Sequence, residues 1–181
     1  QFGSTCHLSY GDKSAKGAYR SIGINRNDFM ALLQMRPDQP EESRAVEWVA
    51  YASNAFNTMV PFYANVERTP EYLANTTGTV STDNFYWTSR LIAAMADASY
   101  NKSLFHLERY EEAVLSAARA LVNQYDAKLA AEQDAARRAA LREEANTAIA
   151  AMLQEKAADT LDKVLFELSS QMKNAYSRSD A

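Results

Sequence analysis

The residues that break helices are confined to the first part of this chain. Among its 181 residues, all five glycines and all four prolines lie at or before Gly78: Gly3, Gly11, Gly17, Gly23, Gly78, Pro37, Pro40, Pro61 and Pro70. The remainder is rich in Ala, Leu, Glu, Lys, Arg and Gln, which are strong helix formers. This distribution predicts an α+β fold, with a β-rich portion over residues 1–80 and an all-helical portion over residues 81–181.

The β-rich portion contains a predicted hairpin. Two apolar and aromatic runs, Val46–Tyr51 and Met59–Val66, flank the polar segment Ser53–Thr58. Each run has the length and the β-branched and aromatic content of one strand, and turn-forming residues separate them, so we expect an antiparallel pair. Pro61 lies inside the second run and has no backbone N–H, which predicts an edge strand or a bulge there.

A third strand is predicted beside the hairpin. The run Asp28–Met35 is short and mostly apolar, and the turn that follows it contains Pro37 and Pro40. Three antiparallel strands leave an exposed edge on each side and are marginally stable unless something covers those edges. We therefore expect either further strands of a longer protein or self-association into a homo-oligomer to complete the sheet.

Helix signals begin near residue 69. Thr69 followed by Pro70 predicts the cap and the first residue of a short helix. The segment Ser81-Thr82-Asp83 offers caps for a second helix that extends to about Tyr100, and Asn101-Lys102-Ser103 predicts its end.

Two long apolar stripes at helical spacing follow. One occupies Leu107–Tyr125 and the other Ile149–Met172. Residues 128–146, between them, are rich in alanine and charge and have little apolar face. We therefore expect an antiparallel helical hairpin whose exposed tip is this middle segment.

Composition and charge exclude several classes of function. The chain is 47% hydrophobic and 23% charged, and no apolar run is long enough to cross a bilayer, so we expect no membrane contact. The net charge of −4 argues against nucleic acid, which favours a basic surface. A single cysteine provides no disulfide framework, and the predicted setting is the cytoplasm.

Few residues are placed to carry chemistry. Adjacent side chains on an extended segment point to opposite faces, so we do not expect Cys6 and His7 to form a thiol–imidazole pair. The other histidine, His106, is distant, and no carboxylates stand at ligand spacing, which predicts no metal site and no cofactor. Asn54 and Asn57 are candidates for substrate binding at the hairpin end, although turn formation also explains them.

Several blocks, read in order, resemble a known family. They are Ile22–Arg26, Leu33–Asp38, Ala45–Ala50, Ser53–Asn57, Val60–Val66, Val80–Asp83 and Phe85–Trp87. Together they are similar to the C-terminal part of bacterial cysteine dipeptidases of family C69, over about residues 20–110. The alanine-rich helices fit the helical C-terminus of that family with less specificity.

The resemblance implies an N-terminal nucleophile hydrolase that needs no metal or cofactor. A cysteine exposed by autocatalytic cleavage attacks the peptide carbonyl, and its own α-amino group acts as the base. The resemblance also implies a four-layer αββα fold with Val46–Val66 in one of the two central sheets. Cys6 does not lie in a segment that resembles the processing site, so we place the nucleophile upstream and assign no catalytic residue in this chain.

Three hypotheses for function follow, of which we prefer the first. In it, the chain is the C-terminal portion of a dipeptidase, inactive alone, whose partners are dipeptide substrates and the missing N-terminal part of the same protein. The second is a non-enzymatic helical interaction module, which predicts an exposed apolar stripe on Leu107–Tyr125 or Ile149–Met172. In the third, cleavage after Thr5 makes Cys6 the nucleophile, and an intact mass would reject it.

Overall fold

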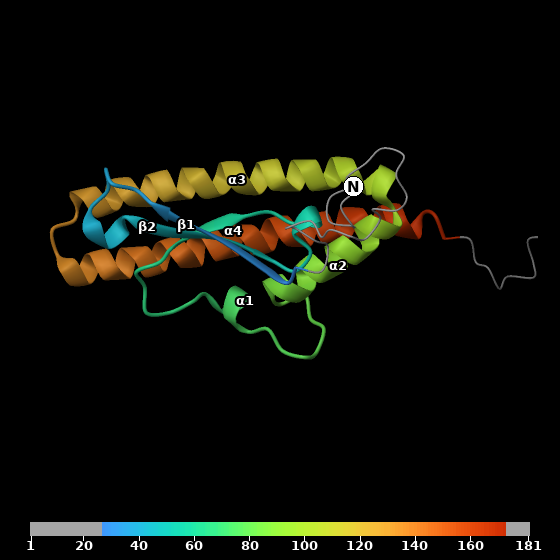
Figure 1. Cartoon of the computed structure of the whole chain (residues 1–181), viewed down its shortest axis with the longest axis horizontal. Helices are drawn as coiled ribbons and strands as arrows, with labels where there is room; N and C mark the ends of the chain where they lie inside the picture. Colours follow the sequence, from blue (N-terminus) through green and yellow to red (C-terminus); the bar gives the residue numbers. More distant parts are fainter. Residues whose placement is uncertain (1–26, 173–181) are drawn as a thin grey trace, which may run out of the picture.

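The computed structural model describes residues 27–172 and places a small sheet against a pair of long helices (Figure 1). In this part of the chain, three antiparallel strands precede four α-helices, which confirms the predicted α+β class. The two longest helices run side by side along the molecule, and the strands lie alongside them (Figure 1).

The strands are β1 (Phe29–Met35), β2 (Ala45–Tyr51) and β3 (Val60–Tyr63), in the spatial order β1-β2-β3. β2 and β3 form the predicted hairpin, and β1 pairs with the other side of β2. Two short 3₁₀ turns, η2 (Glu41–Ser43) and η3 (Asn54–Phe56), lie in the connections. β3 ends at Tyr63, before the predicted Val66, because from Asn65 onward the backbone bonds to side chains of the last helix instead of β2.

Backbone hydrogen bonds at the strand ends show which groups β1 turns toward β2. Ala52 N donates to Asp28 O (2.8 Å) and Arg36 N donates to Arg44 O (3.0 Å). Bonded pairs recur every second residue in an antiparallel ladder, so the even-numbered residues of β1 bond to β2. The odd-numbered residues direct their N–H and C=O groups to the opposite side.

The same pattern explains how β3 accommodates Pro61. Ala64 N donates to Ala45 O (3.1 Å), which makes Val60 and Phe62 the β3 residues that bond to β2. Pro61 therefore turns its backbone nitrogen away from β2, where a missing N–H breaks no ladder bond. β3 is an edge strand of the described sheet, as Pro61 predicted.

The four helices are α1 (Glu71–Ala74), α2 (Phe85–Ala98), α3 (Tyr100–Ala131) and α4 (Ala135–Ser169). Both predicted helix starts are displaced toward the C-terminus, by one residue at α1 and by one to three residues at α2. Asn84 caps α2 in place of Ser81-Thr82-Asp83, because its Oδ1 accepts from Trp87 N (2.9 Å). Pro70, rather than Thr69, occupies the cap position of α1.

The interruption between α2 and α3 lies at Ser99, so the predicted break at Asn101-Lys102-Ser103 is wrong. These three residues are inside α3. Ser99 has φ −125° and ψ 33°, outside helical geometry, and its hydroxyl donates to Met95 O (2.8 Å). A serine hydroxyl bonded to the preceding turn offers the backbone an alternative to continuing the helix.

The helical hairpin is present, but its exposed tip is shorter than predicted. Only residues 132–134 separate α3 from α4. Leu129, Leu141, Ala145 and Asn146 lie within residues 128–146 and are buried. The expectation that this segment buries little is wrong because the inner face of α4 packs there against α3 and β3.

One hydrophobic core joins the sheet to the helices. It includes Val60 of β3, Phe85 and Ile92 of α2, and Ile149 and Leu153 of α4, all almost completely buried. Burial of side chains of this size contributes roughly 1.5–3 kcal/mol each before conformational entropy is subtracted. The division into two domains at residue 80 stays a prediction. No helix within residues 27–172 is long and apolar enough to cross a membrane.

Candidate functional site

The predicted substrate-binding asparagines lie in the connection between β2 and β3. Asn57 follows η3 and is half-buried, and its amide closes the loop. The amide nitrogen donates to Tyr51 O, and Oδ1 accepts from Thr58 N (2.8 Å). Asn54 begins η3, and its side chain lies outside the described part of the structure. Contact of either residue with substrate stays a prediction.

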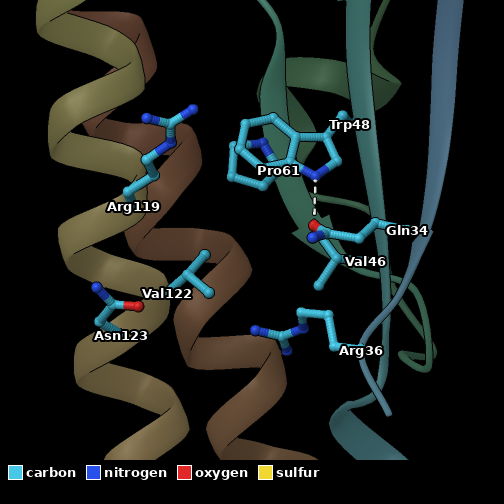
Figure 2. Close-up of a pocket in the computed structure, with 8 residues that line it drawn as sticks. All are labelled: Gln34, Arg36, Val46, Trp48, Pro61, Arg119, Val122 and Asn123. Carbon is cyan, nitrogen blue, oxygen red and sulfur yellow. Dashed lines mark hydrogen bonds between the residues drawn. The ribbon is translucent and has the colours of Figure 1, made fainter. Parts of the chain in front are cut away.

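A hollow of about 210 Å³ lies between the sheet and α3 (Figure 2). The strands contribute Gln34, Val46, Trp48 and Pro61, Arg36 directly follows β1, and α3 contributes Arg119, Val122 and Asn123. On the strand side, Trp48 Nε1 on β2 donates to Gln34 Oε1 on β1 (2.9 Å). Gln34 is the β1 residue paired with Val46, so this bond links the two strands across the sheet face. The hollow therefore has an aromatic and apolar wall with polar groups at its margins.

Arg36 is held at one end of this hollow by a polar network that sequence analysis missed. Its guanidinium donates to both carboxylate oxygens of Asp126 on α3 (2.6 and 3.1 Å) and to Ser43 O (2.5 Å). The Tyr63 hydroxyl donates to Asp126 Oδ1 (2.7 Å). Burial and then the hydrogen bond to Asp126 raise the pKa of Tyr63. The charge of Arg36 is thus compensated, and the network ties β1 and β3 to α3.

Arg119 presents a second positive charge at the hollow. It is exposed on α3, and it forms no ion pair among residues 27–172. Figure 2 shows its side chain on the same helix as Asn123, across the hollow from the strands. An uncompensated guanidinium beside an apolar wall can bind the carboxylate of a small ligand.

A second hollow, of about 240 Å³, lies on the opposite face of the sheet. Glu47 and Tyr51 of β2 line it together with Ala64 and residues 66–70, which follow β3. Burial, and then the negative charge of Glu47, raise the pKa of Tyr51. α4 holds the wall in place, since Glu143 Oε1 accepts from Glu67 N (2.8 Å) and Arg68 N (3.2 Å).

Residues 27–172 contain no cysteine and a single histidine, His106. His106, on α3, lies 3.3 Å from Glu167 on α4 and far in sequence from the sheet. Cys6 and His7 lie outside the described residues. Within residues 27–172 there is also no cluster of three or more His, Cys, Asp or Glu side chains that could hold a metal ion. The described residues therefore supply no cysteine nucleophile.

The chain matches the family model described as peptidase family C69 over residues 2–113. It is 42% identical over 172 residues to probable dipeptidase A of Streptococcus pyogenes serotype M18, covering 95% of this chain and 35% of that protein. It is 36% identical over 207 residues to a dipeptidase of Bifidobacterium longum, covering 94% of this chain and 39% of that protein.

A third relative matches a shorter region. Dipeptidase A of Lactobacillus helveticus is 40% identical over 99 residues, which cover 53% of this chain and 21% of that protein. The chain therefore spans between about a third and two fifths of the length of the first two relatives. The family model covers more than half of the chain, and the resemblance expected from the sequence blocks is confirmed. This chain belongs to peptidase family C69.

Proposed function

We propose that this chain is the C-terminal portion of a dipeptidase that hydrolyses dipeptides by cysteine N-terminal-nucleophile catalysis. The observation that carries the proposal is the 42% identity, over 95% of the chain, to a probable dipeptidase of which it spans 35%. The proposed nucleophile lies upstream of this chain, and residues 27–172 serve as a scaffold for the site. These residues contain no cysteine, which agrees with that role.

The proposed chemistry needs a cysteine thiolate, its own α-amino group and donors for an oxyanion, and residues 27–172 contain no cysteine. The cysteine thiolate adds to the carbonyl carbon of the dipeptide, and the α-amino group of the same cysteine accepts the thiol proton. Hydrogen-bond donors stabilise the resulting oxyanion. The contribution of this chain is to position the site, and Asn54 and Asn57 remain the candidates for contact with the substrate.

The proposal also names partners and a setting. The partners are dipeptide substrates and the remaining part of the same polypeptide, and the setting is the cytoplasm. The relatives are longer than this chain, which supports the second of these partners.

The test is hydrolysis of a panel of dipeptides by three samples: this chain, this chain alkylated at Cys6, and the full-length Streptococcus pyogenes relative. We expect turnover only in the full-length protein. Turnover by this chain that alkylation abolishes would make Cys6 the nucleophile and would contradict the upstream placement. Absence of turnover in the full-length relative would reject the dipeptidase function.

One observation supports the alternative of a non-enzymatic helical interaction module. Leu165 and Phe166 are exposed on α4, within the stripe that this alternative predicts to be free. Hydrolysis of dipeptides by the full-length relative would argue against this non-enzymatic alternative.

A further inference from the structure

β1 is an apolar strand that the described residues leave uncovered. Every residue of β1 except Met30 is exposed, and Phe29, Leu32, Leu33 and Met35 have exposed fractions of 52–77%. No charged residue lies between Phe29 and Met35. Soluble proteins protect such edges with charges, prolines, bulges or covering segments, because an uncharged apolar edge pairs with other strands.

β1 is nevertheless anchored at both ends in its extended form. At its start, Asp28 Oδ1 lies 3.3 Å from the Tyr86 hydroxyl and 3.4 Å from Arg90 Nη1, both on α2. At its end, Arg36 forms the ion pair with Asp126 on α3. An exposed strand that is held in place at each end can add a neighbour with little further loss of conformational entropy.

The opposite edge of the sheet is closed. Tyr63 turns its backbone away from β2, and the buried side chain of Asn146 on α4 meets it. Tyr63 N donates to Asn146 Oδ1 (2.8 Å), and Asn146 Nδ2 donates to Tyr63 O (3.0 Å). The amide therefore replaces the two bonds that a further strand would make. The Asn146 amide and Pro61, which has no N–H, together prevent a further strand from pairing with β3.

The odd-numbered residues of β1 have both backbone groups and apolar side chains available to a neighbouring strand. Their backbone N–H and C=O groups point away from β2, as the ladder shows. Their side chains lie on the sheet face opposite the hollow at α3, since Gln34 lines that hollow and successive side chains alternate. Phe29, Leu33 and Met35 thus combine unpaired backbone groups with exposed apolar side chains among the described residues.

We propose that β1 is an internal strand of a larger sheet in the full-length protein. A strand from the part of the family C69 polypeptide that this chain lacks pairs with Phe29, Ala31, Leu33 and Met35, and an apolar layer of it covers their side chains. The inference rests on the proposed function only in placing this chain within a longer C69 protein. Three observations select this occupant: within residues 27–172 the sheet can extend on this side alone, the strand is uncharged, and the chain spans 35% of its relative.

Proline substitution in this chain tests the orientation of the strand. Ala31→Pro removes an N–H that points to the open edge, so we expect the free energy of unfolding to change by no more than about 1 kcal/mol, as on other edge strands. Leu32→Pro removes an N–H bonded to β2 and should lower that free energy by about 3 kcal/mol. Equal losses for the two variants would overturn the assignment of the edge.

Hydrogen exchange resolved to single residues tests the occupant. In this chain, measured as a monomer, amides of the odd-numbered β1 residues should exchange rapidly and those of Met30, Leu32 and Gln34 slowly. In the full-length Streptococcus pyogenes relative, every amide of the matching segment should exchange slowly, whatever the protein concentration. Rapid exchange at alternate positions in that protein would overturn the proposal.

Two further outcomes separate this inference from its alternatives. Protection that is lost when the full-length relative is diluted to a monomer would assign the edge to a second copy and overturn the proposal. Hydrolysis of dipeptides is measured separately on the same sample. Slow exchange of the β1 amides without hydrolysis would support the internal strand and reject the dipeptidase function. Hydrolysis with rapid exchange at alternate β1 amides would support the dipeptidase function and reject the internal strand.

Discussion

The side chain of Asn146 closes one edge of the sheet. It lies on α4 but forms two hydrogen bonds with the backbone of Tyr63 on β3, and it is 1% exposed. Buried backbone groups that lose their partners are costly because water cannot replace the bond. The side chain therefore forms the two backbone hydrogen bonds that a further strand would form at this edge of the sheet.

Replacement of this side chain should be strongly destabilising. Asn146→Ala leaves Tyr63 N–H and C=O buried without partners, and we expect a loss of about 2–4 kcal/mol in the free energy of unfolding. Urea denaturation measures it. The matched control is Asn123→Ala on α3, where the side chain is exposed and a change within about 0.5 kcal/mol is expected. Equal effects would show that the edge contact contributes nothing.

The hydroxyl of Tyr110 is buried without a hydrogen-bond partner among residues 27–172, and burial raises its pKa. The unfolded state, with a tyrosine pKa near 10, therefore releases this proton at a lower pH than the folded state. The contribution of Tyr110 to stability is complete below that pH and falls as the pH rises above it.

The variant Tyr110→Phe should remove this alkaline sensitivity. At pH 7 we expect equal or slightly greater stability than the unaltered chain, by up to about 1 kcal/mol, because an unsatisfied polar group is lost. Above pH 10 the advantage of the variant should increase. Urea denaturation at pH 7 and pH 10.5 measures both values, and a constant difference between them would contradict the role of Tyr110 ionisation.

Among the helices, α2 begins after Asn84, whose side chain accepts a hydrogen bond from a backbone N–H in the first turn. Asn84 is buried and accepts from Trp87 N, whereas Asp83 is exposed and bonds within the loop, where its N–H donates to Ser81 Oγ (3.0 Å). Several cap residues occur in succession here, so composition alone does not identify the one in use.

Two alanine variants distinguish these caps. Asn84→Ala should lower the free energy of unfolding by about 1–2 kcal/mol, because the first turn of α2 loses its acceptor. Asp83→Ala should change it by less than about 0.5 kcal/mol, as is usual for exposed positions. Thermal or urea denaturation is sufficient, and a larger effect at Asp83 would move the cap to the position that the sequence alone suggested.

For the whole molecule, the open β1 edge has a consequence when this chain is studied alone. An uncharged, exposed edge strand should pair with another copy when no other strand covers it. We expect the average mass from analytical ultracentrifugation to increase with concentration, and Leu33→Lys to reduce that increase by introducing a charge at the edge. The control is Val80→Lys, an equally drastic change at an exposed apolar residue outside the sheet. A similar reduction by both variants would exclude β1 as the contact.

The order of elements was accessible from the sequence alone because local chemistry determines it. Glycine and proline before residue 79 restrict the strands to the first part of the chain, and Pro61 predicts an edge strand without any knowledge of its neighbours. The apolar stripes likewise predict two long helices. The blocks around β2 and β3 were sufficient to indicate family C69, which the comparisons confirm.

Only the tertiary structure decided which polar groups meet. Asn146 and Tyr63 are 83 residues apart, and Arg36 and Asp126 are 90 residues apart, so no local pattern relates them. Residues 128–146 are rich in alanine and charged residues, a composition typical of an exposed helix, yet the packing of α4 against β3 buries Leu141 and Asn146. Sequence periodicity determines which face of an element is apolar, whereas the element that covers this face depends on how the whole chain packs.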